Sequence, residues 1–183
     1  MLIEFGSSII KDLKPFGKVF ADPKLHDIPN TIANSIERFS KAGADLITMH
    51  ASNGAEAIKA AVANRGDASI LCVTALTSLS DLDTEYIYKA NSKDTVLKLA
   101  ELANNNGAQG IVCSALELGY LNDFSFIKVT PGIRPSKTND DQKRVATPKE
   151  AISSGSSLLV IGRPITQADN PLEVVKSINS KVN

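Results

Sequence analysis

Three ionisable side chains with a spacing suited to proton transfer lie close together near the amino terminus. The segment DPKLHDIPNT (22–31) contains Asp22, Lys24 and Asp27. Residues two apart on an extended strand point to the same side, so we expect Asp22 and Lys24 to project together, with Asp27 just beyond. Nearby carboxylates favour the charged form of a lysine, and such a lysine suits a proton donor better than a Schiff-base nucleophile.

The same spacing also fits a structural interpretation. Asp22 and Lys24 could form an ordinary surface ion pair, and Asp27 or Asn30 could cap the helix predicted after them. Judged on spacing alone, this interpretation is favoured.

A second group of residues is suited to binding an anion. Arg163 can bind phosphate oxygens in bidentate fashion, and Gly162 lets the backbone approach an anion closely. Arg134 begins a polar segment, 134–144, which has almost no apolar residues to hold it in place. We therefore expect a bound anion to order this segment.

Short apolar runs recur along the chain, and most precede a helical pattern. The predicted strands are residues 18–24, 45–50, 69–76, 110–114, 126–132 and 157–163; the third is followed by a predicted polar loop and then a helix. Strands that alternate with helices predict a parallel sheet covered by helices. Parallel α/β proteins place their sites at the carboxyl ends of their strands. The polar residues at these ends are Asp22, Lys24, His50, Thr77, Arg134 and Arg163. The pattern leaves a barrel and an open flavodoxin-like sheet as alternatives.

The composition argues against several classes of protein. The 183 residues are 43% hydrophobic and 22% charged, which is typical of one globular domain. Lys+Arg and Asp+Glu both number 20, and zero net charge argues against a nucleic-acid-binding protein. No apolar run approaches the roughly 20 residues that span a bilayer, and no signal-peptide pattern is seen. Cys72 and Cys113 lie in apolar runs, which predicts buried thiols and a reducing, cytoplasmic compartment.

Five motifs resemble those of the orotidine 5'-monophosphate decarboxylase family. DPKLHDIPNT is similar to the family signature D-x-K-x-x-D-I-P-x-T. The other similar motifs follow in the family's order: MHASNG (49–54), VTALTS (73–78), VTPGIRP (129–135) with DDQKR (140–144), and VIGRPIT (160–166). The resemblance implies a (β/α)8 TIM barrel, with residues 1–183 as one domain. It also implies conversion of orotidine 5'-monophosphate to uridine 5'-monophosphate and CO2, without a metal or organic cofactor.

The resemblance implies a role for individual residues. Lys24 would stabilise a carbanion at C6 and then protonate it, and Asp22 would face the substrate carboxylate. Asp27 and Thr31 would reach the neighbouring subunit's site, which implies a homodimer with shared sites, and Ile28 would bind the substrate. The other implied contacts are with the pyrimidine, by Thr77 or Ser80, and with the phosphate, by Arg134, Gln142, Gly162 and Arg163.

Part of the family pattern has no counterpart in the sequence. The match begins after the family's second strand, so we expect an N-terminally incomplete barrel of six β/α units. An aspartate of the first strand and a lysine of the second are then missing, and we expect little activity from this chain alone. Two other functions stay open: a Mg²⁺-dependent sugar-phosphate lyase of the same superfamily, and a non-catalytic nucleotide-binding remnant.

Overall fold

The computed structural model describes residues 2–135 and 146–182. Contacts divide the chain into two compact units. The first comprises residues 1–74 and 98–111, and the second comprises residues 75–97 and 112–183.

The first unit is built on parallel strands. These are β1 (Phe20–Leu25), β2 (Leu46–His50) and β3 (Ser69–Val73). β2 lies between the other two strands and pairs with β3 in unbroken register over its whole length. The side chains of Ile47, Met49, Ile70 and Leu71 are all fully buried, as expected for strands covered on both faces.

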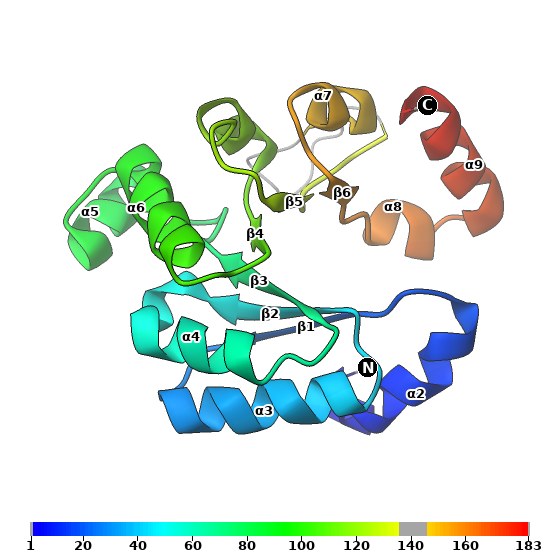
Figure 1. Ribbon diagram of the computed structural model, residues 1–183. Coiled ribbons are helices and arrows are strands. Elements are labelled where there is room, and N and C mark those ends of the chain that lie inside the picture. Colours follow the sequence, from blue (N-terminus) through cyan, green and yellow to red (C-terminus); the bar gives the residue numbers. More distant parts are fainter. Residues whose placement is uncertain (1, 136–145, 183) are drawn as a thin grey trace. The chain divides into compact units, whose positions relative to one another are not determined.

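Helices and short turns precede or follow each of these strands. α3 begins with Pro29, a residue favoured at the first helical position because its missing N–H has no partner to lose there. Ile32 and Ile36 lie one turn apart and are fully buried, and α3 packs beside α4 (Figure 1). The elements are α1 (Leu2–Phe5), α2 (Ser8–Leu13), η1 (Lys14–Phe16), α3 (Pro29–Lys41), η2 (Ala51–Asn53) and α4 (Ala55–Ala63).

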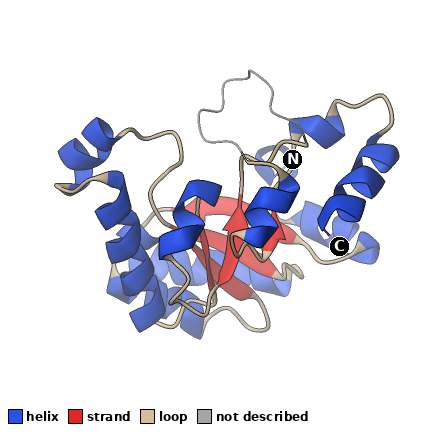
Figure 2. Cartoon of the chain, turned by 90° about the horizontal axis from the view of Figure 1, so that it is seen from above, coloured by secondary structure: helices blue, strands red, loops and turns tan. Residues whose placement is uncertain are grey.

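The second unit continues the alternation of strands and helices along the chain. Figure 2 colours the strands of the whole chain red and the helices blue. β5 pairs in parallel with β6. Of the helices that the structure describes, none is long and apolar enough to cross a membrane. α6 (Ser92–Asn105) and β4 (Gly110–Val112) have residues in both units; the other elements of this unit are α5 (Asp81–Tyr88), η3 (Ala115–Tyr120), β5 (Ile127–Thr130), α7 (Pro148–Ser153), β6 (Leu158–Leu159), α8 (Arg163–Thr166) and α9 (Pro171–Val182).

The order of the strands separates the two fold classes that the sequence pattern left open. Within residues 2–135 and 146–182, six strands follow one another as neighbours in the order β1-β2-β3-β4-β5-β6. A flavodoxin-like sheet reverses its strand order at a switch point, whereas a barrel adds each new strand beside the last. The observed order is that of a β/α barrel. β6 is shorter than the predicted strand 157–163, since only Leu158 and Leu159 pair regularly.

One helix lies where a polar loop was expected. Residues 81–88 form α5, so the loop prediction is wrong there. Ser80 Oγ accepts the backbone N–H of Asp83 at 3.2 Å, and the Asp83 carboxylate accepts the backbone N–H of Ser80 at 2.8 Å. This reciprocal capping box starts the helix, and Ser-x-x-Asp was its signal in the sequence.

The two thiols lie in the interior, as predicted. Cys72 and Cys113 are both buried and unpaired. Burial raises the pKa of each to about 12. Both therefore stay protonated at neutral pH, and they act as small apolar residues of the core.

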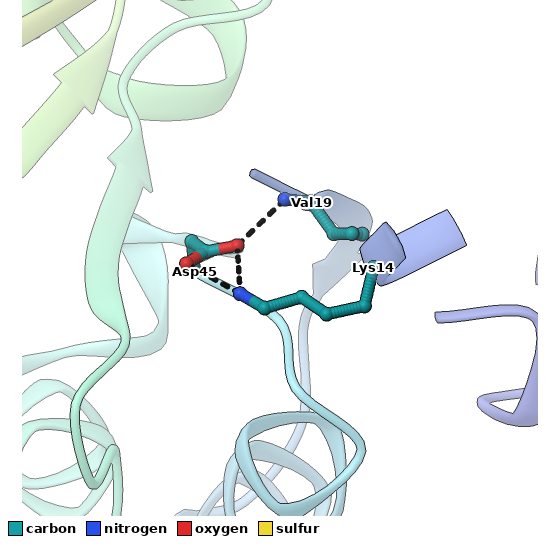
Figure 3. A network of polar contacts seen from close by, with 3 residues as sticks. All are labelled: Lys14, Val19 and Asp45. Atoms are coloured by element: carbon teal, nitrogen blue, oxygen red, sulfur yellow. Dashed lines mark hydrogen bonds and ion pairs between the residues drawn. The ribbon is translucent and has the colours of Figure 1, made fainter. Parts of the chain in front are cut away.

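Asp45, which directly precedes β2, ties the amino end of β1 to η1, the short helix before that strand (Figure 3). Both of its carboxylate oxygens accept from Lys14 Nζ at 2.7 Å, and one also accepts the Val19 N–H at 2.6 Å. The backbone N–H of Asp45 donates in return to the Val19 carbonyl at 2.9 Å. The Lys14 hydrogen bond, followed by the Val19 N–H, holds the pKa of Asp45 below its usual value of 3.8.

We expect Asp45→Asn to lower the free energy of unfolding by about 1–2 kcal/mol at neutral pH, because it removes a charged acceptor shared by two donors. A carboxylate whose pKa is depressed in the folded state stabilises the protein fully at pH values above its usual pKa of 3.8, and this stabilisation is lost as the pH falls through the folded pKa. The difference in the free energy of unfolding between Asp45→Asn and the parent should therefore narrow as the pH falls below 3.8. Urea unfolding at several pH values measures it. The control is Asp12→Asn, at an exposed position of α2, and equal stability of both variants and the parent would contradict the expectation.

Candidate functional site

The carboxyl end of β1 presents two of the predicted site residues to solvent. Lys24 Nζ donates to Asp22 Oδ2 and forms an ion pair with it. The side chain of Lys24 is 44% exposed and that of Asp22 is 38% exposed. The two groups therefore project together, as predicted, and a ligand can reach both.

The backbone is irregular where these side chains project from β1. The register between β1 and β2 shifts between Ala21 and Leu25. Lys24 has a φ of +48°, in the left-handed region that is costly for residues with a Cβ. Pro23 lies inside the shift, where its missing N–H interrupts no regular ladder. Such bulges re-aim side chains, and strained backbone of this kind is concentrated at functional sites.

β2 supplies the polar contacts of this ion pair from the buried side. Thr48 is fully buried; its hydroxyl donates to Asp22 Oδ1 at 2.8 Å and accepts the Lys24 N–H at 3.0 Å. No motif in the sequence singled out Thr48. The only signal for it was its place in a predicted strand, two residues before His50.

His50 lies at the end of β2, with its ring 5.2 Å from the ring of His26. Burial is the largest cause that lowers the pKa of His50; electrostatic interactions with His26 and Lys24 act in the same direction, and Asp22 opposes them. His50 is therefore neutral at neutral pH.

Asp27 lies in the turn between β1 and α3, and it does not cap that helix. Its Oδ1 accepts the N–H of the adjacent Ile28 at 2.7 Å, and Ile28 is the N-cap residue without a side-chain hydrogen bond. The prediction that Asp27 or Asn30 caps the helix is therefore wrong. Asn53 holds the turn instead: its side chain accepts the Asp27 N–H at 3.0 Å and donates to the Leu25 carbonyl at 2.9 Å.

Ile28 and Thr31 lie on the surface beside this turn. Ile28 is 67% exposed, and Thr31, in the first turn of α3, is also exposed. The substrate contact of Ile28 and the role of Thr31 across a subunit interface stay predictions.

Two further predicted residues follow β3 in the second unit. Thr77 lies half-buried in the turn after the strand. The Ser80 hydroxyl is engaged in the helix cap, since it donates to Asp83 Oδ2 at 2.6 Å and accepts the Asp83 N–H at 3.2 Å. Any contact of Ser80 with a ligand would compete with this cap.

The predicted anion-binding residues also belong to the second unit. Arg134 is 7% exposed, and its Nη1 donates to the Ile133 carbonyl at 3.1 Å. A Cβ placed on Gly162 would meet no atom within 4 Å, and Arg163, the first residue of α8, is exposed. Gln142 and most of the segment 134–144 lie outside the described residues, so their role and the ordering of that segment stay predictions.

The predicted residues thus form two groups, one in each unit, and their meeting in a single site stays a prediction. Asp22, Lys24 and Asp27 all lie at the carboxyl end of β1 or in the turn after it. Among the described residues, no three His, Cys, Asp or Glu side chains are grouped so that they could hold a metal ion.

The left-handed backbone of Lys24 has a measurable consequence for stability. Lys24→Gly and Lys24→Ala both remove the ion pair, but only glycine adopts a φ of +48° without a Cβ penalty. We expect Lys24→Gly to be more stable than Lys24→Ala by about 1 kcal/mol in urea unfolding. The matched control is Lys59, an exposed residue inside α4, where Gly should instead be less stable than Ala by about 1 kcal/mol. The same order at both positions would contradict the left-handed conformation of Lys24.

Comparison with known proteins places most of the chain in one family. The model of the orotidine 5'-phosphate decarboxylase / HUMPS family matches residues 1–178. The orotidine 5'-phosphate decarboxylase of Staphylococcus aureus (strain Newman) is 44% identical over 179 residues, which cover 92% of this chain and 78% of that protein. The enzyme of the same name from Pseudoalteromonas translucida (strain TAC 125) is 42% identical over 193 aligned positions, covering 100% of this chain and 82% of the relative.

Solved structures are similar over nearly the whole chain. The orotidine 5'-phosphate decarboxylase of Lactobacillus acidophilus has a TM-score of 0.85 and 38% identity, and the match covers 97% of this chain and 81% of that one. The orotidine 5'-phosphate decarboxylase of Pyrococcus horikoshii OT3 has a TM-score of 0.79 and 25% identity, with coverage of 99% and 82%. With the strand order, these similarities confirm the predicted fold class, a (β/α)8 barrel of which the described residues supply six strands.

Proposed function

Because this chain belongs to the orotidine 5'-phosphate decarboxylase / HUMPS family, we propose that it converts orotidine 5'-monophosphate to uridine 5'-monophosphate and CO2. The observation that carries this proposal is the accessible Asp22–Lys24 pair at the carboxyl end of β1, in a chain 44% identical to an enzyme of that name. We place the reaction in pyrimidine synthesis in the cytoplasm, and assign its chemistry to side chains of the protein without a metal or organic cofactor.

Lys24 is the proposed proton donor. When the bond between C6 and the carboxylate breaks, its electron pair stays on C6 and CO2 departs. The ammonium of Lys24 would stabilise the negative charge that develops there, and Nζ would then transfer a proton to C6. Lys24 would recover this proton from solvent, which the 44% exposure of its side chain permits.

Asp22 would act on the substrate through charge. A carboxylate held beside the substrate carboxylate repels it, and the repulsion ends when CO2 leaves, so the reactant is destabilised relative to the transition state. Thr48 holds Oδ1 of Asp22, and Lys24 holds Oδ2. These two contacts oppose rotation of Asp22 away from a bound substrate.

The remaining substrate contacts are assigned to the second unit. We assign the pyrimidine contact to Thr77 in preference to Ser80, because the hydroxyl of Ser80 already serves as a helix cap. The open space around Gly162 allows phosphate oxygens to approach the backbone, and the adjacent Arg163 can supply a bidentate contact. Arg134 and Gln142 complete the proposed set of phosphate-binding residues.

Release of labelled CO2 from carboxyl-labelled orotidine 5'-monophosphate measures the activity directly. We expect Lys24→Ala to reduce kcat by about a thousandfold or more, because it removes both the stabilising charge and the proton. Lys41→Ala is the matched control: Lys41 is also exposed and paired with a carboxylate, that of Glu37 at 2.7 Å, but lies near the end of α3. It should turn over at the parental rate. Substantial turnover by Lys24→Ala would remove Lys24 from the proposed role.

The same assay separates the alternatives. A chain that binds uridine 5'-monophosphate but releases no CO2 would be the non-catalytic remnant. Turnover of a sugar phosphate that stops when Mg²⁺ is chelated would favour the lyase, although both relatives described above are named as decarboxylases.

We also propose a homodimer in which Asp27 and Thr31 of one subunit contribute to the site of the other. The exposure of Asp27, Ile28 and Thr31 supports this, and two-fold dimers are the commonest oligomers. In a mixture of the inactive variants Lys24→Ala and Asp27→Ala, each hybrid dimer would contain one site with both residues intact. An equal mixture should regain roughly one quarter of the parental activity, since about half of the dimers are hybrids. No recovery after proven subunit exchange would exclude shared sites.

A further inference from the structure

We propose that Thr48 is a positioning residue, which holds Asp22 and Lys24 in the geometry that decarboxylation requires. The inference rests on the proposed function and adds to it a side chain from the neighbouring strand. Thr48 itself is fully buried, so it would act through the two residues that it contacts.

A single oxygen atom of Thr48 contacts both members of the pair. Oγ1 donates to Asp22 Oδ1 at 2.8 Å and accepts the backbone N–H of Lys24 at 3.0 Å. A hydroxyl has one proton and two acceptor positions, so both bonds can exist at once. β2 is held in register on its other side, where Thr48 lies opposite Leu71 of β3. The hydroxyl is therefore attached to a rigid part of the first unit.

The Asp22–Lys24 pair needs such an attachment because its other constraints are weak. Both side chains are more than one third exposed, and solvent-exposed ion pairs are screened and retain much rotamer freedom. The backbone of β1 also leaves its regular register at this point, so that Lys24 donates to the Thr48 side chain and not to a ladder carbonyl. Thr48 thus fixes the carboxylate at one end and the lysine backbone at the other.

Decarboxylation makes this geometry consequential. Asp22 has to face the substrate carboxylate while Lys24 Nζ stays within reach of C6, and small misplacements of reacting groups reduce rates strongly. The proposed phosphate and pyrimidine contacts are made by other residues, so losing the hydroxyl should lower kcat much more than it changes KM. A merely structural threonine would instead lower the amount of folded protein.

The test compares Thr48→Val, which has nearly the same shape without the hydroxyl, with Thr48→Ser, which keeps it. Thr95→Val is the matched control, because Thr95 of α6 is 2% exposed and its hydroxyl donates to a backbone carbonyl, that of Ala90 at 3.3 Å. We expect Thr48→Val to lower kcat by about 10- to 100-fold with KM within about twofold. The kcat of Thr48→Ser should stay within about threefold of that of the parent, and the kcat of Thr95→Val should equal it. All rates are expressed per folded molecule.

Amide hydrogen exchange of Lys24, followed by NMR, tests the same contact without turnover. Exchange at Lys24 should be faster in Thr48→Val than in Thr48→Ser, because only serine keeps the acceptor for this N–H. If the parental chain releases no CO2, the proposed function fails, and faster exchange still supports the positioning contact. Equal exchange in the two variants would overturn it. In an active chain, two results would overturn the positioning role. One is a kcat of Thr48→Val equal to that of the parent, and the other is a loss of activity in Thr48→Val that only follows its folded fraction.

Discussion

One buried hydroxyl group connects the two residues that would carry out the chemistry. Thr48 Oγ1 binds the Asp22 carboxylate and the backbone N–H of Lys24 at the point where β1 departs from regular pairing with β2. A backbone donor that leaves a sheet ladder has to find another acceptor. The Thr48 side chain provides it, and in doing so makes the left-handed conformation of Lys24 compatible with the sheet.

The two ends of β1 and β2 serve different purposes: contacts at the amino ends contribute stability, and the carboxyl end of β1 carries the residues proposed for chemistry. At the amino ends, the Asp45 carboxylate joins Lys14 to the Val19 backbone, and every group in this contact is paired. At the carboxyl ends, the backbone is strained and an ion pair faces solvent. This division is typical of β/α barrels, whose sites lie at the carboxyl face while the opposite face contributes stability.

Much of the fold could be predicted from the sequence because its signals are local. Apolar runs at six places indicated the strands, and the helical patterns between them indicated a parallel sheet covered by helices. Helix α5 was predictable too, since Ser80 and Asp83 have the spacing of a capping box, but the polar composition of the segment favoured a loop. The choice between a barrel and an open sheet depends on which strands become neighbours. The strand runs do not encode that choice, and the motif resemblance was needed to make it.

For the candidate site, the sequence by itself determined which side chains can do chemistry, and the tertiary structure decided what holds them. Asp22, Lys24 and Asp27 were predictable because their types and spacing lie within one short segment. The side chains that orient this segment, Thr48 and Asn53, come from 24 to 28 residues further along the chain. A contact of this kind has no local signature, because it exists only once β2 is laid beside β1. The positive φ of Lys24 could not be predicted from the sequence either. Glycine is the usual signal for that conformation, whereas here a lysine is held in it by its neighbours.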